Sequence, residues 1–371
     1  MKTILFIYGT RPEAIKMAPL IIEFKKYPEL FNIKVCLTGQ HRQMLDQINN
    51  FFEIKADYDL NIMSLNQTLF EITSRCLSGL KSILDQVIPD LIFVQGDTTS
   101  VMAGSLAGFY NRIPVAHLEA GLRTNNKYSP FPEEMNRILT SHIADFHFSP
   151  TSRAVENLKH ENITNNVYLV GNTIIDALYM GLNNIKNETK KYEKYFSFLD
   201  MSKRIILVTG HRRENFGEGF DNICKSIAYI ASKYDNIQFL YPVHFNPNVK
   251  KSVDEILKNI ERVFLVDPLD YPQLLWIMDK CYFVLTDSGG IQEEAPALGK
   301  PVLVMREVTE RQEGVNAGTA RIVGTEYKCI VDSMQELLDD ENSYKKMSNS
   351  INPYGDGTAS KEIVKIIKSI L

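Results

Sequence analysis

Short runs of apolar residues alternate with longer amphipathic stretches through the first half of the chain. Runs rich in β-branched and aromatic residues predict strands, and they lie at residues 3–8, 34–38, 91–95, 115–118 and 146–149. The stretches between them repeat their apolar positions at helical spacing. Because alternating strands and helices are typical of a parallel sheet covered by helices on both faces, we expect such a sheet here.

The same pattern starts again in the second half of the chain. Short apolar runs return at residues 205–209, 237–242, 263–266, 283–286 and 301–305, with helical patterns such as 220–234 between them. At 371 residues, the chain exceeds the length at which one hydrophobic core usually keeps growing. The sequence therefore predicts an α/β protein with two Rossmann-like parallel-sheet domains facing a cleft, at residues 1–170 and 171–358.

Two segments depart from this alternation. Residues 183–203 are rich in lysine, glutamate, asparagine and tyrosine, which favours an exposed connection or a solvated helix of either domain. Residues 359–371 carry apolar side chains at helical spacing, namely Ile363, Val364, Ile366, Ile367 and Ile370. Such a stripe predicts a helix that packs on another part of the chain.

Composition and charge exclude several classes of protein. With 44% hydrophobic and 23% charged residues and a net charge of -4, the chain is of ordinary globular type, and its scattered basic residues argue against nucleic-acid binding. Gly9 and Arg11 interrupt the first apolar run before a signal peptide or membrane span forms, so we expect a cytoplasmic protein without a membrane partner. The five cysteines are widely separated and include no CxxC pair, so no disulfide framework and no metal site are expected.

Candidate chemistry follows the predicted strands, because open parallel sheets bind ligands beyond the carboxyl ends of their strands. After the first strand, Gly9 permits a tight turn, and Arg11 and Lys16 add positive charge near a helix amino terminus, where anions are favoured. The segment contains one glycine rather than a GxGxxG pattern, which argues against a dinucleotide cofactor. The alternative is an ordinary strand-to-helix turn with two solvated cations.

Carboxylates follow neighbouring strands in the same half. Asp97 and Glu119 each end an apolar run, so both can face one crevice, where burial and mutual repulsion favour acid–base use. The alternative for Asp97 is a helix N-cap. Glu133 and Glu134 follow Pro132, and for this pair a solvated first helical turn is the competing interpretation.

The second half offers anion-binding groups at equivalent places. His211, Arg212 and Arg213 follow its first strand and can hold a diphosphate or exchange a proton, and His244 follows the next strand. The Ser288-Gly289-Gly290 turn presents backbone N–H groups to a phosphate, and Glu294 one turn later can accept ribose hydroxyls. The charged segment 306–313, which includes Arg311, either lines the cleft or is solvated.

The motifs taken together resemble one family. They are GTRPEAIKMAPL, QGDTTS, HLEAGLRT, PFPEEMNR, TGHRREN, DSGGIQEEAPALGKPVLVMREVTERQEG and NPYGDGTAS, and their order along nearly the whole chain is similar to that of the non-hydrolysing UDP-N-acetylglucosamine 2-epimerases. The resemblance implies a glycosyltransferase-B fold, a C-terminal helix 359–371 that crosses back to the first domain, a homodimer and no cofactor.

The resemblance also implies roles for particular residues. Its catalytic positions fall on Arg11, Lys16, Asp97, Glu119, Glu133 and His211. Its UDP-binding positions fall on Arg11, His211, Ser288, Gly289, Gly290, Glu294 and Arg311. A second UDP-N-acetylglucosamine, bound as an activator, would contact Gln40, Gln43, Gln67, Arg212 and His244. Asn66 stands where the pattern has an arginine, and this departure bears on activation rather than on catalysis.

The implied reaction suits these groups. The hydrogen on carbon 2 of an N-acetylamino sugar has no adjacent carbonyl to acidify it, so the reaction needs either oxidation of a neighbouring hydroxyl or departure of UDP to give a 2-acetamidoglucal. The absence of GxGxxG and the many anion-binding groups favour elimination and re-addition of UDP, with one carboxylate on each face of the sugar. We expect the two domains to close around the intermediate. We also expect the reaction to supply precursors for bacterial surface polysaccharides.

Other functions remain open at this point. A glycosyltransferase of the same fold would also hold a UDP-sugar, a hydrolysing epimerase would release free N-acetylmannosamine, and a non-catalytic sensor would only bind the nucleotide sugar. A 2-epimerase of another UDP-aminosugar, such as one that forms UDP-N-acetyl-L-fucosamine, would share these motifs.

Overall fold

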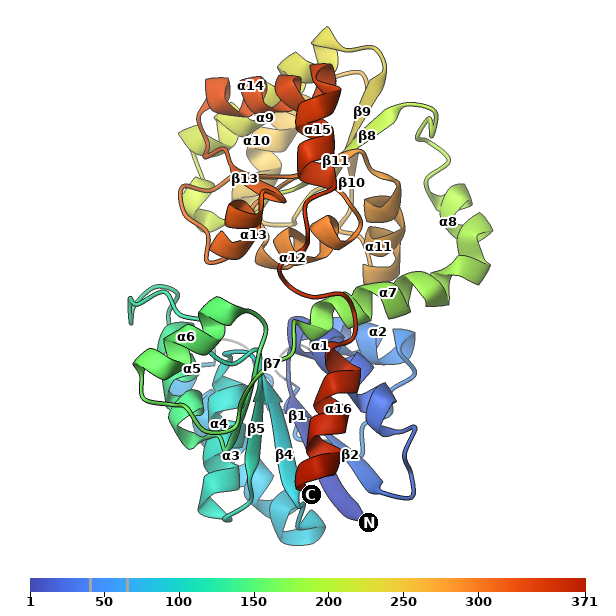
Figure 1. The fold of residues 1–371 in the computed structure, drawn as a ribbon. Coiled ribbons are helices and arrows are strands. Elements are labelled where there is room, and N and C mark those ends of the chain that lie inside the picture. Colours follow the sequence, from blue (N-terminus) through green and yellow to red (C-terminus); the bar gives the residue numbers. More distant parts are fainter. Residues whose placement is uncertain (40–41, 65–66) are drawn as a thin grey trace. The chain divides into compact units, whose positions relative to one another are not determined.

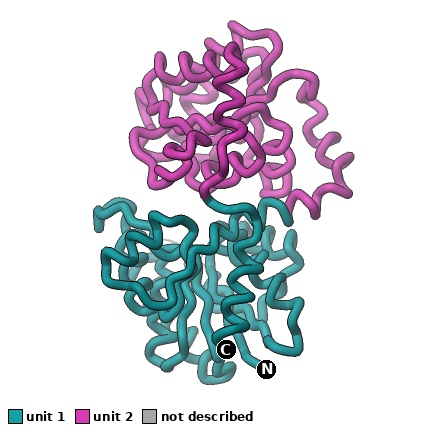
Figure 2. Tube along the Cα trace, in the orientation of Figure 1, with its two compact units in different colours: residues 1–180, 354–371 teal, residues 181–353 magenta. Residues whose placement is uncertain are grey.

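The computed structural model describes residues 1–39, 42–64 and 67–371. It divides into two compact units (Figure 2), of which unit 1 comprises Met1–Met180 with Tyr354–Leu371, and unit 2 comprises Gly181–Pro353. Each unit is an α/β structure built on one parallel sheet. The predicted fold class is thereby confirmed.

Unit 1 has a seven-stranded sheet in the order β3-β2-β1-β4-β5-β6-β7. Its strands are β1 (Lys2–Tyr8), β2 (Phe31–Leu37), β3 (Tyr58–Asp59), β4 (Leu91–Gln95), β5 (Val115–Leu118), β6 (Phe146–Ser149) and β7 (Val167–Leu169). Its helices are α1 (Arg11–Phe24), α2 (Arg42–Phe51), α3 (Leu69–Val87), α4 (Thr99–Tyr110), α5 (Glu133–Ile143), α6 (Ser152–His160), the first part of α7 (Thr173–Ile185), and α16 (Ala359–Ile370). The strand order changes direction between β1 and β4, which is where sheets of this kind open a crevice.

Aromatic and aliphatic side chains hold the helices of unit 1 on the sheet. The ring of Phe6 stacks on that of Phe93 at 5.1 Å, and Phe24 of α1 meets Phe6 edge-on at 5.8 Å. Leu5 and Ile7, which alternate with Phe6, point to the opposite face and join a cluster with residues of α3 and α4. Both faces of the sheet are therefore buried, as expected for parallel strands.

Helix α16 contacts α1 of the same unit. Ile363, Val364 and Ile367 of its apolar stripe are buried. At its start, the backbone N–H of Ser360 donates to Asp176 of α7 at 2.7 Å. Residues at the two ends of the chain thus complete one core (Figure 1).

Unit 2 has a six-stranded sheet in the order β10-β9-β8-β11-β12-β13. Its strands are β8 (Arg204–Thr209), β9 (Ile237–Pro242), β10 (Val263–Val266), β11 (Phe283–Thr286), β12 (Val302–Val304) and β13 (Ala320–Ile322). Its helices are the end of α7, the short η1 (Lys186–Glu188) and η2 (Arg213–Asn215), α8 (Thr189–Tyr195), α9 (Glu218–Lys233), α10 (Pro247–Leu257), α11 (Tyr271–Lys280), α12 (Gly289–Ala297), α13 (Gln312–Ala317), α14 (Tyr327–Asp339) and α15 (Glu341–Ser348). Its order changes direction between β8 and β11.

The polar segment 183–203 is largely helical, and aromatic contacts anchor it to the rest of unit 2. Phe196, which is buried, stacks on the ring of Trp276 in α11 at 5.2 Å with an interplanar angle of 5°. The composition of the segment predicted an exposed connection or a solvated helix, and most of its residues are indeed exposed and helical. A few aromatic residues pack it on unit 2.

The structure also bears on the excluded classes. Among the described residues, no group of histidine, cysteine, aspartate and glutamate side chains is arranged to hold a metal ion. Over the same part of the chain, no helix has the length and apolarity needed to cross a membrane. Four cysteines are buried, and Cys329 is exposed.

Candidate active site

The turn after β1 is fixed by a buried carboxylate, Glu13. Its Oε2 accepts the backbone N–H groups of Gly9 and Thr10 at 2.8 and 2.6 Å, and its Oε1 accepts the hydroxyl of Thr98 at 2.6 Å. Burial raises the pKa of Glu13 above its ordinary value, and these hydrogen bonds oppose the shift. Because Thr98 is the N-cap of α4, Glu13 ties together the loops that follow β1 and β4. Sequence reasoning missed this role, although Thr10 and Glu13 form a capping-box pattern.

Glu119 and Lys16 form a buried ion pair at this edge of the sheet. Nζ of Lys16 lies 2.5 Å from Oε1 of Glu119, and the two side chains are 9% and 8% exposed. Gln95 donates to Oε2 of Glu119 at 2.6 Å, and Asn172 donates to Oε1 at 3.2 Å. Lys16 therefore binds a carboxylate of its own unit. Arg11, the other cation of this loop, is half-buried in the first turn of α1.

The backbone of Glu119 is strained. Its φ is +63°, in the left-handed region that non-glycine residues rarely adopt and that costs of order 1 kcal/mol or more. Three side-chain partners hold the carboxylate in place against this strain. Strain maintained at a buried charged residue is typical of functional sites, which supports Glu119 as a site residue.

Asp97 follows β4 and is paired with Arg137 of α5. Oδ2 of Asp97 accepts from Nη2 and Nε of Arg137 at 2.7 and 3.0 Å, and its side chain is 28% exposed. The N-cap of α4 is Thr98, whose hydroxyl accepts the N–H of Val101, so the alternative interpretation of Asp97 as the cap is wrong. A side-chain carbon at Gly96 would lie 3.6 Å from Oε2 of Glu119. The residue before Asp97 thus lies within contact distance of the second carboxylate.

The two glutamates at the start of α5 have different environments. Glu134 is 1% exposed, and its Oε1 accepts the backbone N–H groups of Thr124 and Asn125 at 2.9 Å each while its Oε2 pairs with Arg137 at 3.0 Å. Glu133 is half-buried, and its buried Oε2 has no hydrogen-bond partner within the described residues. Glu134 accordingly holds the loop at Thr124 and Asn125, and Glu133 stays the predicted site residue of this pair.

Replacing Arg137 with methionine is expected to lower the free energy of unfolding of unit 1 by about 3 kcal/mol. The substitution leaves the buried carboxylate of Glu134 without its cation, and breaking one side of a buried pair costs about 3 to 5 kcal/mol. Urea unfolding followed by circular dichroism measures the change. As a control, Arg321→Met removes the half-exposed ion pair with Glu336 in unit 2. This substitution is expected to lower the free energy of unfolding by about 1 kcal/mol or less. Equal costs would contradict this account of Arg137.

In unit 2, the loops after β8 and β11 meet at a buried carboxylate, Asp287. Its Oδ2 accepts the backbone N–H groups of His211 and Arg212 at 2.8 Å each. The ring of His244 stacks on that of His211, with 5.1 Å between centroids. Burial lowers the pKa of His244, and the neighbouring His211 lowers it further. The structure thus brings together two of the histidines that the sequence singled out.

The turn after β11 leads into α12, with Ser288 as its N-cap and Gly289 and Gly290 in its first turn. Arg311 lies directly against it, since a side-chain carbon at Gly289 would come within 3.2 Å of Cζ of Arg311. Helix amino termini bind anions through free backbone N–H groups, and a guanidinium at the same place adds charge. Glycine leaves the room that this approach requires.

Three glutamates near this turn have fixed hydrogen-bond or ion-pair partners. Glu293 accepts from Nε of Arg311 at 2.8 Å. Glu294, which is buried, accepts the hydroxyl of Tyr271 at 3.0 Å through Oε1. Although burial alone would raise it, the guanidinium groups of Arg311 and Arg306 hold the pKa of Glu310 at about 2. Sequence reasoning found Glu294 and Arg311 but missed Tyr271 and Glu293.

The residues predicted for an activator are only partly described. Gln40, Asn66 and the side chain of Gln43 lie outside the described residues. Gln67 donates from Nε2 to the backbone carbonyl of Ile62. Arg212 is half-buried and His244 stacks on His211.

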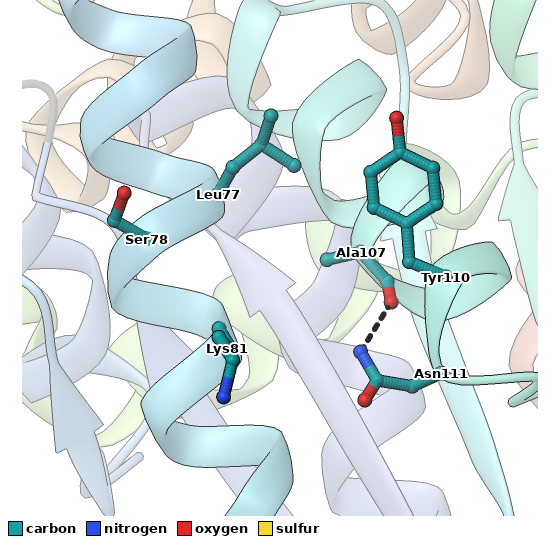
Figure 3. Close-up of a pocket in the computed structure, with 6 residues that line it drawn as sticks. All are labelled: Leu77, Ser78, Lys81, Ala107, Tyr110 and Asn111. Atoms are coloured by element: carbon teal, nitrogen blue, oxygen red, sulfur yellow. Dashed lines mark hydrogen bonds between the residues drawn. The ribbon is translucent and has the colours of Figure 1, made fainter.

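A hollow of unit 1 lies away from these groups. It lies between α3 and α4 (Figure 3) and is lined by Leu77, Ser78, Lys81, Ala107, Tyr110 and Asn111. Tyr110 and Asn111 close α4 shortly before β5 begins, so this part of α4 lies toward the amino ends of the strands. A lining with one lysine as its only charged group carries no acid–base pair.

The fold and these two sets of side chains define an α/β protein of the class with two Rossmann-like domains, with paired carboxylates beyond one sheet and anion-binding groups beyond the other. The chain belongs to the UDP-N-acetylglucosamine 2-epimerase family, whose model matches residues 23–368. The family identified from the sequence motifs is therefore confirmed, and with it the enzyme class, an epimerase and hence an isomerase.

Individual relatives agree with this assignment. A protein of Escherichia coli (strain K12) named UDP-N-acetylglucosamine 2-epimerase is 52% identical over 370 residues, which are 99% of this chain and 98% of the relative. The crystal structure of UDP-GlcNAc 2-epimerase from Neisseria meningitidis bound to UDP-GlcNAc has 50% sequence identity and a TM-score of 0.93, and the match covers 99% of this chain and 100% of that one. The Methanocaldococcus jannaschii enzyme in complex with UDP-GlcNAc and UDP shares 33% identity with a TM-score of 0.83, over 99% of each chain.

Proposed function

We propose that this protein interconverts UDP-N-acetylglucosamine and UDP-N-acetylmannosamine by inverting carbon 2. The observation that carries the proposal is the pair of carboxylates at neighbouring strand ends, Asp97 and a strained, buried Glu119, in a chain of the epimerase family. An elimination mechanism needs an acid or base on each face of the sugar, and these two groups with Glu133 are the candidates.

The proposed reaction is balanced without a redox partner. One carboxylate takes the proton from carbon 2, the electron pair of that C–H bond forms the C1–C2 double bond, and the bond from carbon 1 to the UDP oxygen breaks. A second acid then delivers a proton to the other face of carbon 2 while UDP oxygen attacks carbon 1 again. The assignment of base and acid among Asp97, Glu119 and Glu133 is a question for the variants discussed below.

The anion-binding groups have defined roles in this proposal. The Ser288-Gly289-Gly290 turn and Arg311 bind the diphosphate, and Glu294 accepts ribose hydroxyls, consistent with its burial beside Tyr271. His211 and Arg11 stabilise UDP as it leaves, since charge that develops in the transition state is best met by groups already in place. Neither a metal ion nor a nicotinamide enters the proposed steps.

Incubation with UDP-N-acetylglucosamine in deuterated water is expected to place deuterium on carbon 2 of both epimers. Oxygen-18 placed in the bridge between carbon 1 and phosphorus is expected to move into non-bridging positions, because only rupture of that bond frees the oxygen. Mass spectrometry and NMR follow both labels.

Free N-acetylmannosamine would indicate a hydrolysing epimerase, and exchange at carbon 2 without movement of oxygen-18 would contradict elimination. Transfer to an added acceptor would indicate a glycosyltransferase, and a panel of UDP-aminosugars identifies the preferred substrate.

We also propose that the protein is a homodimer. Two large aromatic side chains, Phe109 and Tyr110, are 61% and 67% exposed with 6.2 Å between ring centroids, a kind of surface that interfaces cover. Sedimentation equilibrium tests the proposal, and a monomer at micromolar concentration would contradict it.

Activation by a second UDP-N-acetylglucosamine is likewise proposed, through Gln40, Gln43, Gln67, Arg212 and His244. It predicts that conversion of UDP-N-acetylmannosamine alone is slow and accelerates when a little UDP-N-acetylglucosamine is added. Equal rates with and without the addition would contradict it. We place the reaction in the cytoplasm, in the supply of precursors for bacterial surface polysaccharides.

A further inference from the structure

The carboxylate of Asp287 has two oxygens with different environments. Oδ2 accepts the N–H groups of His211 and Arg212 at 2.8 Å and faces Nδ2 of Asn215 at 3.4 Å. Oδ1 is buried, has no hydrogen-bond partner within the described residues, and faces Nδ1 of His211 at 3.7 Å. Since an ionised carboxylate oxygen buried without a donor is costly, the facing ring nitrogen is the natural donor to Oδ1.

The strands explain why these groups meet. Thr286 at the end of β11 pairs in register with Thr209 at the end of β8. The residues that follow each strand, Asp287 and the Gly210-His211 step, therefore emerge side by side at the switch point of the unit 2 sheet. Asp287 is fully buried, whereas the side chain of His211 is 47% exposed. The exposed imidazole thus has one edge toward a buried carboxylate and the rest toward solvent.

A second contact restricts the ring. The imidazole of His244 stacks on that of His211 with an interplanar angle of 13°. Nδ1 of His244 accepts the backbone N–H of Asn246 at 3.1 Å, so the proton of neutral His244 is on its Nε2. With one face of His211 covered and its Nδ1 edge directed at Asp287, a small rotation closes the 3.7 Å separation to a hydrogen bond.

We propose that Asp287 is a positioning residue that fixes His211 as the Nδ1–H tautomer. In that tautomer, Nε2 carries the lone pair and faces away from Asp287. Nε2 can then exchange a proton with an anionic leaving group. The catalytic part of this inference rests on the proposed function of His211. The assignment of the tautomer does not depend on that function.

The tautomer is measured directly on full-length protein labelled with nitrogen-15 histidine. Long-range nitrogen–proton NMR spectra distinguish a protonated Nδ1 from a protonated Nε2. The expected result for the wild type is Nδ1–H at His211, and finding Nε2–H there would overturn the proposal irrespective of any variant. Failure of the proposed function would appear separately, as unchanged activity in His211→Asn.

Asp287→Asn tests the effect on the reaction. Asparagine keeps an oxygen for the two backbone N–H groups but turns an NH₂ toward His211, which forces the proton onto Nε2. We expect kcat to fall by about 10³- to 10⁴-fold with KM within a few-fold of wild type, since the same change in a Ser-His-Asp triad produces the wrong histidine tautomer and costs about 10⁴-fold in kcat. Unchanged kcat, or the wild-type tautomer in the variant, would overturn the proposal.

Asn215→Ala is the matched control for damage to the loop. Asn215 donates to the backbone carbonyl of Met305 at 3.0 Å and contacts the same carboxylate oxygen, Oδ2, so its loss loosens the loop without altering Oδ1. The control is expected to lower the melting temperature yet retain Nδ1–H at His211. A purely structural Asp287 would instead give both variants the same tautomer and the same change in kcat.

Discussion

Replacing Glu119 with glutamine is expected to lower kcat by about 10³-fold, within the 10²- to 10⁴-fold range typical for loss of a general acid or base. The same change leaves the buried ammonium of Lys16, which lies 2.5 Å from Oε1 of Glu119, without its counter-charge. Because breaking one side of a buried pair is destabilising, the single variant is expected to lose stability as well as activity.

The double variant Lys16→Met with Glu119→Gln separates the two losses. Removing both charges is expected to restore much of the stability, because a buried ion pair is often no better than apolar groups of similar volume, while the rate stays low. Thermal unfolding and turnover of UDP-N-acetylglucosamine are measured on the same preparations. Recovery of activity in the double variant would contradict a direct role for Glu119 or Lys16.

Solvent exchange from each epimer shows on which face of the sugar a carboxylate acts. In a mechanism with one group on each face, a variant that lacks one of them exchanges the carbon 2 hydrogen of one epimer and not of the other. Asp97→Asn is expected to give the opposite preference to Glu119→Gln if these two residues are the pair. If Asp97→Asn instead exchanges both epimers, Asp97 is not the partner and Glu133 is the next candidate. Loss of exchange from both epimers in Glu119→Gln would contradict a role of Glu119 on one face only.

The alternation of apolar and polar positions predicted five strands of each sheet but missed the short strands β3, β7 and β13. Strand β4 matches the predicted residues 91–95 and β6 matches 146–149, because parallel strands buried on both faces read as continuous apolar runs. The candidate residues followed from the rule that ligands bind at carboxyl strand ends. Gly9, Gly96 and His211 lie there because each directly follows or closely follows a strand.

The partners of those residues could not be predicted in the same way. Arg137 pairs with Asp97 across 40 positions, and Asp287 reaches His211 across 76. Such contacts depend on which strands become neighbours, and no local periodicity encodes that order. Gln95 illustrates the difficulty, since it reads as the last residue of a strand and only the structure shows its amide bound to Glu119.

A lower pH is expected to destabilise unit 1 through two buried histidines. His117 of β5 and His147 of β6 pair in register and are 0% and 2% exposed. Nε2 of His117 lies 2.7 Å from the carbonyl oxygen of Gly96, and Nδ1 of each ring has no hydrogen-bond partner within the described part of the chain. Burial lowers the pKa of His117 to about 3 and that of His147 to about 4.

The sign of the effect follows from which state binds the protons. Below the ordinary pKa of about 6.5, the unfolded chain protonates both rings while the native state keeps them neutral. The neutral histidines therefore contribute fully to the free energy of unfolding above about pH 6.5, and this contribution is lost as the pH falls toward 4. By pH 5 the loss is about 2 kcal/mol per histidine. Glu13 and Asp176, whose pKa values burial raises, act in the opposite direction, so variants are needed to isolate the histidines.

The variant His117→Gln with His147→Gln is expected to be less stable at pH 7 but to lose far less stability between pH 7 and pH 5 than the wild type. Urea unfolding followed by circular dichroism reports both units, whereas fluorescence of Trp276, the single tryptophan, reports unit 2 and serves as an internal reference. His160→Gln replaces an exposed histidine and should retain the wild-type pH dependence. Nε2 of His117 contacts the carbonyl oxygen of Gly96, which directly precedes Asp97. Protonation of His117 therefore affects the strand ends that carry Asp97 and Glu119. An equal pH dependence in the double variant and the wild type would show that these rings do not control the acid stability of unit 1.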